Sequence, residues 1–252
     1  MINSDFHLKV LTYNIHKGFS PGNARFVLRE IREALTIIHP DLVFLQEIQG
    51  EHFKHRTHIT NWPTESQFEF LADQLWSHHA YAKNAIYEEG HHGNAILSKY
   101  PIVSWENIDV SPYPTASRSI LHGVIEIPEL HFKLHALCIH LGLFKIEREQ
   151  QLITLCQRIE SHVPHNEPLI IGGDFNDWRG HAEAHLEQDL ELREVFKVLT
   201  GNHARSFPAW RPTLQVDRIY FRGVKPELCA RLKQEPWKRL SDHLPLYAEF
   251  SV

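Results

Sequence analysis

The chain has 252 residues, of which 42% are hydrophobic and 23% are charged, and its formal net charge at pH 7 is −5. This composition is typical of a folded protein with a hydrophobic core. The acidic balance argues against a nucleic-acid binder that is basic throughout, although it leaves room for a local basic patch. No apolar run is long enough to span a bilayer, and the first ten residues lack the basic and apolar regions of a signal peptide. We therefore expect a cytoplasmic protein.

The cysteines are odd in number, lie far apart and form no CxxC pair: Cys138, Cys156 and Cys229. Cysteines with this spacing are more often free, buried thiols in a reducing compartment than disulfides or metal ligands. The 20 histidines mostly occur singly or in pairs. Most of them are therefore interpreted as surface or hydrogen-bonded residues.

The first part of the chain predicts a strand, a helix and a second strand in succession. Residues 8–15 alternate in polarity and are rich in β-formers, which indicates a strand with Asn14 near its end. Apolar residues recur at helical spacing over 25–38, which predicts an amphipathic helix. Residues 41–47 are apolar until they reach Glu47, a pattern typical of a central strand that carries an acid to its end.

A polar segment over residues 50–63 is predicted to form a surface loop. Histidines recur in it at three-residue spacing and could bind a metal ion, but no acidic or cysteine ligand belongs to the pattern, so the surface interpretation is preferred. These histidines are His52, His55 and His58. A helix is then predicted at 66–76, followed by strands at 81–87, 94–98 and 102–110.

The second half of the chain continues to alternate between the two kinds of element. A loop rich in proline and serine at residues 112–117 leads to Arg118, which opens a strand. The remaining predicted elements are helices at 145–163 and 190–199 and strands at 119–127, 131–140, 169–171, 216–221 and 244–252. No repeat, low-complexity tract or linker divides the sequence. We therefore expect one domain over residues 1–252, of class α/β or α+β, with large sheets flanked by helices.

Residues 169–178, LIIGGDFNDW, join a short buried strand to a group of polar side chains. The two glycines allow a close approach of the backbone at the end of this strand. Asp174 and Asn176 are two apart, so they point to the same side of an extended chain. A carboxylate beside an amide suits a hard cation and phosphate oxygens better than zinc. The alternative interpretation is an Asx-rich turn that closes a strand.

Polar residues recur at other predicted strand ends, as in sites that are assembled at one edge of a sheet. They are Asn14, Glu47, His140, Asp217, Asp242 and His243. Simpler explanations exist for some of them. Asp217 beside Arg218 could be a surface ion pair, and Asp242 with His243 could form a turn. The recurrence of such residues over the whole chain favours a site.

Seven motifs that occur in order carry a resemblance to a known family: TYNIHKG, LQE, GNAILSKYP, IHLG, GDFND, VDRIYF and SDHLPL. Together, from about residue 8 to the C-terminus, they resemble the endonuclease/exonuclease/phosphatase superfamily, in a branch of bacterial type. This superfamily includes deoxyribonucleases, abasic-site endonucleases, neutral sphingomyelinases and inositol-polyphosphate phosphatases. The resemblance implies a four-layer α/β sandwich of two packed mixed sheets flanked by helices, and a metal-dependent phosphoric ester hydrolase.

The resemblance also implies a role for each residue of the predicted site. Mg²⁺, with Mn²⁺ as an alternative, would be held mainly by Glu47, assisted by Asn14 and Asp242. His243 would face the scissile phosphate and be held by Asp217, while water attacks in line without a covalent enzyme intermediate.

Five further residues complete the implied catalytic set. Asp174 would orient or deprotonate the attacking water, and Asn176 would hold a phosphate oxygen. His140 resembles the second histidine of the deoxyribonuclease and sphingomyelinase branches, with Glu89 as its carboxylate partner. Arg118 would be a second phosphate clamp.

The substrate is left open by the sequence, with a preference for a phospholipid or small phosphodiester. Such a substrate needs a pocket, and an aromatic lip would allow peripheral membrane contact. Residues in predicted loops that could form the lip are Trp62, Tyr113, Trp178 and Trp210. A binding module of the same fold is a third hypothesis, and it should have lost at least one of the catalytic residues, all of which this chain keeps. The sequence does not indicate an oligomeric state.

Nucleic acid is the alternative substrate, because residues 205–240 are rich in cations and contain Trp210 and Trp237 as possible stacking groups. Against three acids, this segment carries Arg205, Arg211, Arg218, Arg222, Lys225, Arg231, Lys233, Lys238 and Arg239. A solvated face with two core tryptophans would explain the same composition.

Overall fold

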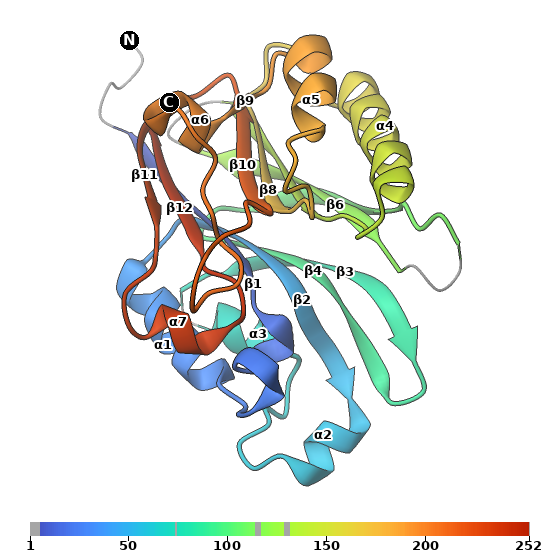
Figure 1. The fold of residues 1–252 in the computed structure, drawn as a ribbon, viewed down its shortest axis with the longest axis vertical. Helices are drawn as coiled ribbons and strands as arrows, with labels where there is room; N and C mark the ends of the chain where they lie inside the picture. The colour runs from blue at the N-terminus through green and yellow to red at the C-terminus, as the bar shows by residue number, and fades with distance from the viewer. Residues whose placement is uncertain (1–5, 74, 114–116, 129–131, 252) are drawn as a thin grey trace.

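Two mixed β-sheets of six strands each pack face to face, and helices cover their outer faces (Figure 1). This is the α/β sandwich that the resemblance implied. The computed structural model describes residues 6–73, 75–113, 117–128 and 132–251. The first five residues, residues 114–116 of the predicted loop and His131 at the start of a predicted strand lie outside the described residues.

The first sheet has the strand order β11-β12-β1-β2-β4-β3, so both ends of the chain contribute to it. Its central strands β1 and β2 are parallel, and its other neighbours are antiparallel. The bounds of its strands are β1 (His7–Asn14), β2 (Leu42–His52), β3 (His78–Tyr87), β4 (Gly90–Ser98), β11 (Lys225–Arg231) and β12 (Leu246–Ser251).

The second sheet has the order β5-β6-β7-β8-β10-β9 and repeats the same plan, with β7 and β8 as its parallel pair. Its strands are β5 (Ile102–Asp109), β6 (Ser119–Ile127), β7 (Phe132–His140), β8 (Leu169–Asp174), β9 (Arg193–Glu194) and β10 (Asp217–Arg222). In each sheet a helix connects the two parallel strands, so the carboxyl ends of these strands point to the same edge.

The helices divide between the two outer faces (Figure 1). Apolar side chains of α1 (Leu28–Ile38), α3 (Gln67–Ala72) and α7 (Trp237–Leu240) pack against the first sheet. Those of α4 (Lys145–His162) and α5 (Ala182–Leu190) pack against the second. A third core fills the space between the sheets. The remaining helices are α2 (Phe53–His58), α6 (Val195–Thr200) and two 3-10 turns, η1 (His16–Gly18) and η2 (Pro21–Asn23).

Gly172 of β8 makes the close approach that the sequence predicted. A Cβ atom built on this glycine would lie 2.4 Å from the Phe44 ring of the facing sheet. The absence of a side chain therefore lets a phenylalanine fill the space between the two sheets beside the site.

Two local predictions were wrong, and a third predicted element is too long. The predicted loop at 50–63 contains the end of β2 and the helix α2. Strand β2 keeps pairing with β4 as far as His52. The side chain of His52 then caps α2, because it accepts a hydrogen bond from the backbone N–H of His55. The helix predicted at 190–199 begins only at Val195, where the Glu194 side chain caps its first turn. The predicted helix at 66–76 is shortened to α3, whose Ser66 forms a capping box with Glu69.

Among the described residues, no helix has both the length and the apolar character needed to cross a membrane. Cys138 and Cys229 carry free thiols, as predicted, but of the three cysteines only Cys138 is fully buried. Its Sγ contacts the Gln46 side chain and donates to the Leu45 carbonyl between the sheets, and burial raises the pKa of this thiol to about 12. Cys138 is therefore a packing residue.

Candidate active site

Strand register in the second sheet places three polar side chains in one row. Asp174 at the end of β8 pairs with His140 at the end of β7 and with Asp217 at the start of β10. Side chains at directly paired positions lie on the same face of a sheet. Two carboxylates and an imidazole thus meet at one edge, and all three residues are buried.

Asn14, at the end of β1, links the two sheets at this edge. Its Nδ2 lies 3.3 Å from Oε1 of Glu47 and 3.2 Å from Oδ2 of Asp174. The backbone N–H of His16 donates to Oδ1 of Asn14 at 3.0 Å, which fixes the orientation of the amide. Asn14 therefore holds the two carboxylates through its nitrogen, whereas the resemblance implied that it would be a metal ligand.

Glu47 reaches the site from a bulge, not from the end of its strand. The register between β2 and β4 shifts between Leu45 and Ile48, and Glu47 has a φ of 54°. A positive φ is uncommon for glutamate, and a bulge of this kind redirects a side chain. Burial acts to raise the pKa of Glu47, but His140, Lys17 and the Asn14 amide outweigh it and lower that pKa to about 2. Glu47 is thus ionised.

His243 and Asp217 form a buried pair. Nδ1 of His243 lies 2.9 Å from Oδ2 of Asp217, and the Phe207 ring packs against the imidazole at 4.9 Å. Burial acts to lower the pKa of His243, but Asp217 overrides it and raises the pKa to about 10. Ser241 fixes the adjoining turn, because its hydroxyl donates to the Asn14 carbonyl at 2.7 Å and accepts from the His243 N–H.

Asp174 lies between the two histidines. Its Oδ2 is 3.5 Å from Nε2 of His140 and 3.8 Å from Nε2 of His243, and its Oδ1 accepts from the Asn176 N–H at 2.9 Å. Burial raises the pKa of Asp174 to about 7. Burial also lowers the pKa of His140 well below its usual range, assisted by Arg118, so this imidazole is neutral.

A cavity of about 270 Å³ opens beside these groups. Arg118, for which a phosphate clamp is the prediction, lines it. Asn176 lines it too, with its Nδ2 already donating to the Leu141 carbonyl at 3.0 Å. The rest of the lining is partly ionisable and partly apolar: Glu47, His140, Asp174 and His243, with Leu143, Trp178, Phe207, Leu214 and Val216.

Residues 11–243 match the sequence model of the Endonuclease/Exonuclease/phosphatase family. The chain belongs to this family. It is 45% identical over 247 residues to Uncharacterized protein YbhP of Escherichia coli K12, an alignment that covers 98% of this chain and 97% of that protein. A UPF0294 protein of Klebsiella pneumoniae is 28% identical over 163 residues, which cover 62% of this chain and 56% of that protein.

Solved structures of the family share the fold. An endonuclease/exonuclease/phosphatase of Beutenbergia cavernae has a TM-score of 0.76 at 17% identity, covering 98% of this chain and 72% of that one. D. rerio TDP2 complexed with single strand DNA product has a TM-score of 0.72 at 20% identity, and the match covers 98% of this chain and 100% of that one. A mannosyl-6-phosphatase of Bacteroides thetaiotaomicron has a TM-score of 0.73 at 17% identity, and the match covers 97% of this chain and 100% of that one. The predicted family, fold and class of phosphoester hydrolase are thereby confirmed.

Glu89 is not brought into the site of this family member. It lies in the turn between β3 and β4, where its carboxylate accepts from Nζ of Lys54 at 2.5 Å. The prediction that it pairs with His140 was therefore wrong, because β3 and β4 extend as a hairpin beyond the edge where the site lies. The carboxylate next to His140 is Asp174.

The sequence did not single out Lys17, Ser241 or Leu143. Nζ of Lys17 lies 3.6 Å from Oε2 of Glu47, and Leu143 lines the cavity. Lys17 and Ser241 both lie within motifs that were recognised, TYNIHKG and SDHLPL, so their position beside implied site residues was a signal. Leu143 directly follows the IHLG motif and had no comparable signal.

Two groups of side chains could be considered for a metal ion. Asp174, Asp217 and His243 offer ligand atoms within 4.8 Å of one another. However, the imidazole of His243 is already engaged by Asp217, and a protonated imidazole has no lone pair for a metal. Glu47 and Asp242 offer carboxylate oxygens instead. The carboxylate of Asp242 is partly exposed, and its Oδ1 lies 3.6 Å from Nδ1 of His16. The carboxylate oxygens of Glu47 and Asp242 are the kind of ligand that suits a hard divalent cation.

Proposed function

We propose that the protein is a divalent-metal-dependent phosphodiesterase that cleaves a lipid or small-molecule phosphodiester by in-line attack of water. One observation carries this proposal. A single cavity is lined by Asp174 and His243, which form a buried group with Asp217, and by exposed apolar side chains that make up its apolar mouth, Leu143 and Trp178. The buried group supports phosphoester hydrolysis, and the apolar mouth supports a substrate with an apolar part.

The chain's own residues supply the charge and the proton acceptor. His243, held by Asp217 through Nδ1, has Nε2 free to donate to a phosphate oxygen and to stabilise the charge that develops on it. Asp174 lies 3.8 Å from that Nε2, where its carboxylate can orient a water molecule and accept its proton. Attack by water leaves no covalent intermediate on the enzyme.

Glu47 and Asp242 would hold the divalent cation, Mg²⁺ or Mn²⁺, with Asn14 holding Glu47 in place. Mg²⁺ is typically bound through one or two carboxylates and keeps several of its waters, which agrees with two carboxylates here. When bound, the cation neutralises charge on the phosphate and on the leaving oxygen. Arg118 would add a second positive group at the cavity wall.

Next to Leu143, which lines the cavity, the chain carries two further exposed apolar residues where α4 begins. Leu143, Phe144 and Ile146 are 58%, 67% and 72% exposed. Nη1 of the buried Arg148 donates to the Leu143 carbonyl at 2.6 Å, and its guanidinium lies 5.3 Å from the Trp178 ring. Soluble proteins rarely expose such clusters unless they bind something apolar. This exposed apolar segment, here called the lip, therefore supports an amphiphilic diester as the substrate and peripheral contact with a membrane.

Nucleic acid is the second candidate substrate. Trp210 is 69% exposed and could stack on a base. However, the basic segment at 205–240 is only partly available, because Arg218 and Arg222 are buried and donate to backbone carbonyls, and Trp237 lies in the core. A non-catalytic binding module is disfavoured because Glu47, Asp174 and the pair of Asp217 and His243 are all kept.

The test is a substrate panel with Mg²⁺ or Mn²⁺ and an EDTA control. It contains phospholipid in mixed micelles, bis-p-nitrophenyl phosphate, single-stranded DNA and RNA. We expect metal-dependent turnover of the lipid and of the small diester. Phe144→Ser should lower lipid turnover by about 10-fold, because one large apolar contact is lost, and leave the small diester unchanged. Ile37→Ser, which replaces an apolar residue on α1 that is also exposed, is the control.

The outcomes separate the candidates. Cleavage of DNA or RNA with no turnover of either diester would establish the nucleic-acid candidate. If Phe144→Ser and Ile37→Ser behave alike on the lipid, the lip has no part in substrate binding. Turnover that survives His243→Ala would show that the assigned site is not the catalytic one.

A further inference from the structure

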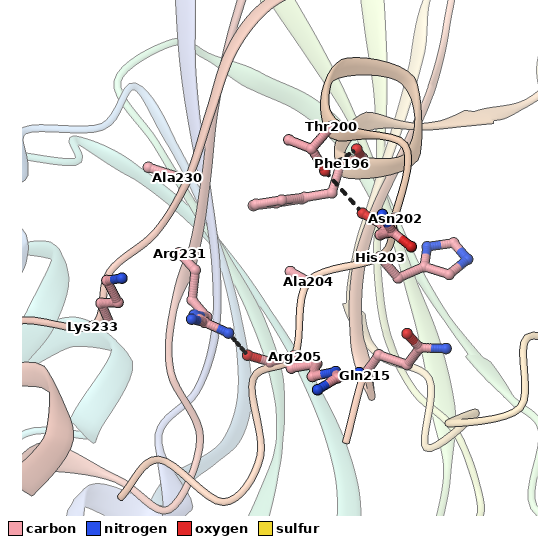
Figure 2. A pocket seen from close by; sticks show the side chains of 10 residues that line it. All are labelled: Phe196, Thr200, Asn202, His203, Ala204, Arg205, Gln215, Ala230, Arg231 and Lys233. Carbon is pink, nitrogen blue, oxygen red and sulfur yellow. Dashed lines mark hydrogen bonds between the residues drawn. The ribbon is translucent and has the colours of Figure 1, made fainter. Parts of the chain in front are cut away.

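A second and larger cavity lies behind the segment that walls the catalytic cavity. Leu214 and Val216 line the catalytic cavity, whereas Gln215 between them lines the second one, which has a volume of about 670 Å³. Figure 2 shows this cavity between the end of β11, which carries Arg231, and the segment that follows α6, which carries Arg205. The two cavities are thus neighbours that share one stretch of chain.

Three cations line the second cavity, and its lining contains no acidic residue: Arg205, Arg231 and Lys233. The nearest acids on α5 and β9 are already engaged. Glu183 pairs with Lys197 and His203, and Glu194 accepts from His203 at 2.9 Å. The positive charges at this cavity therefore lack a counter-charge among its described lining residues.

Arg231 is held in a position that suits an anion. Its Nη1 donates to the carbonyl of Arg205 at 2.6 Å, the contact drawn in Figure 2. Its Nε is buried and has no hydrogen-bond partner among the described residues. Burial lowers the pKa of this guanidinium, and the like charge of Arg205 lowers it further. A buried donor without a partner and a neighbouring like charge are costly without an anion, and a phosphate would supply both an acceptor and a counter-charge.

We propose that Arg205, Arg231 and Lys233 form a phosphate-binding site distinct from the catalytic centre. Phosphate chemistry fits because arginine forks bind phosphate oxygens through paired N–H donors and lysine adds a point charge. The phosphate could be free in solution, or it could be a second phosphate of the substrate. The inference concerns binding alone and goes beyond the proposed reaction.

The position of the site also connects it to the catalytic pair. Arg205 precedes Ser206, whose Oγ accepts the Asp217 N–H at 3.3 Å, and Phe207 packs on His243. A phosphate bound by Arg205 would therefore contact the same segment that backs the catalytic acid and imidazole.

Calorimetric titration of the full chain with inorganic phosphate, in EDTA, tests the proposal without any turnover. We expect wild type to bind phosphate and Arg231→Gln to bind about 10-fold more weakly, the loss typical of one charge-assisted hydrogen bond. Lys225→Gln is the matched control, because Lys225 lies at the other end of β11 and pairs with Glu227. Arg118→Gln, which alters the catalytic cavity, should leave unchanged the affinity of the binding event that Arg231→Gln weakens.

Two results would overturn the proposal: wild type that does not bind phosphate, and Arg231→Gln that binds it as tightly as wild type. Melting curves show whether Arg231→Gln is folded. If it is not, the exposed Arg205→Gln and Lys233→Gln carry the same expectation.

A kinetic arm separates the two sources of phosphate. If the site takes a second phosphate of the substrate, Arg231→Gln raises KM for a diester that carries an additional phosphomonoester, and leaves KM for bis-p-nitrophenyl phosphate unchanged. If the site takes free phosphate, both KM values stay the same in Arg231→Gln while its calorimetric binding of phosphate is weakened. Failure of the proposed function would appear as no turnover by wild type, which leaves the calorimetric result intact.

Discussion

Nδ1 of His243 lies 2.9 Å from Oδ2 of Asp217, and both residues are buried. The other carboxylate oxygen of Asp217 has no hydrogen-bond partner among the described residues. The charge of this acid is therefore directed at one imidazole, which it orients and keeps protonated. Nε2 is left for the cavity, on the side of Asp174. The pair is the part of the site whose geometry most directly implies a chemical role.

Replacing Asp217 by asparagine should abolish most of the activity without unfolding the chain. The amide is similar in size, but it cannot hold His243 as an imidazolium, so kcat for bis-p-nitrophenyl phosphate should fall by about 10²- to 10⁴-fold. The pKa of His243 should fall from about 10 towards its ordinary range, which an NMR titration of the imidazole measures.

The matched control for Asp217→Asn is Asp109→Asn, a surface change at the end of β5 on the same sheet. Equal kcat in wild type and Asp217→Asn would contradict the role given to the pair. So would a large loss of activity with an unchanged His243 titration, because the acid would then act on something other than the imidazole.

Glu47→Gln should weaken activation by Mg²⁺ or Mn²⁺. The ionised carboxylate is the main donor proposed for the cation, and even changes around a metal ligand commonly cost about 10- to 100-fold in metal affinity. The measurement is the metal concentration for half-maximal activity on bis-p-nitrophenyl phosphate. Wild type treated with EDTA should lose activity and regain it when metal is added back.

Glu51→Gln provides the control for Glu47→Gln, since Glu51 is an exposed acid on the same strand. An unchanged metal requirement in Glu47→Gln would exclude this residue as the main ligand. Asp242→Asn should also raise the metal concentration that is needed for half-maximal activity. If Asp242→Asn raises it and Glu47→Gln does not, Asp242 in the turn after α7 is the main ligand.

The row of His140, Asp174 and Asp217 could be expected from the sequence because apolar runs define buried strands, and each run ends or begins with a polar residue. Glu47 was also found this way, but the sequence did not predict its bulge. A bulge depends on how β2 pairs with β4, which no local pattern encodes. Glu89 shows the converse error, since closeness in sequence to a motif on β4 says nothing about how far a hairpin extends.

The number of cationic residues in 205–240 likewise did not show which of them lie on the surface and which lie in the interior. In the VDRIYFR segment, both faces of β10 are buried, so Arg218 and Arg222 lie inside the protein and satisfy backbone carbonyls. The role of Asn14 could not be predicted either. Its amide oxygen accepts a hydrogen bond from the backbone N–H of His16, which leaves the amide nitrogen to donate. Such roles follow from tertiary packing, not from the spacing of residues.

Gly172→Ala should destabilise the protein. The added Cβ would lie 2.4 Å from the Phe44 ring, so the facing sheet must shift, at a cost of about 1–3 kcal/mol in the free energy of unfolding. Urea denaturation measures this cost. The double variant Gly172→Ala with Phe44→Leu should lose less than the sum of the two single changes. Strict additivity would mean that the two residues do not press on each other.

A hydrogen-bonded chain of four side chains lies on the outer side of the second sheet. Nε of Arg158 donates to Nδ1 of His122 at 3.1 Å, Nε2 of His122 lies 2.8 Å from Nδ1 of His135, and Nε2 of His135 lies 2.7 Å from a carboxylate oxygen of Glu167. Because arginine only donates, each imidazole must accept through Nδ1 and donate through Nε2, so both histidines are neutral.

Stability should therefore fall as the pH falls below about 6. Burial, with His135 and Arg158, lowers the pKa of His122 to about 3, whereas in the unfolded chain it has the ordinary value of about 6.5. Between these values the unfolded state binds a proton that the folded state does not, so the free energy of unfolding drops by about 1.4 kcal/mol per pH unit from this group. His122→Gln should be less stable at pH 8, yet have a flatter slope between pH 6 and 4.

The measurement is urea denaturation at several pH values, and the quantity compared is the slope of the unfolding free energy against pH. His165→Gln, an exposed histidine in the turn between α4 and β8, should keep the wild-type slope. If His122→Gln keeps it too, His122 must take up its proton in the folded state as readily as in the unfolded one. Nδ1 of His122 would then carry a proton and could no longer accept from Arg158, which would contradict the chain of donors described above.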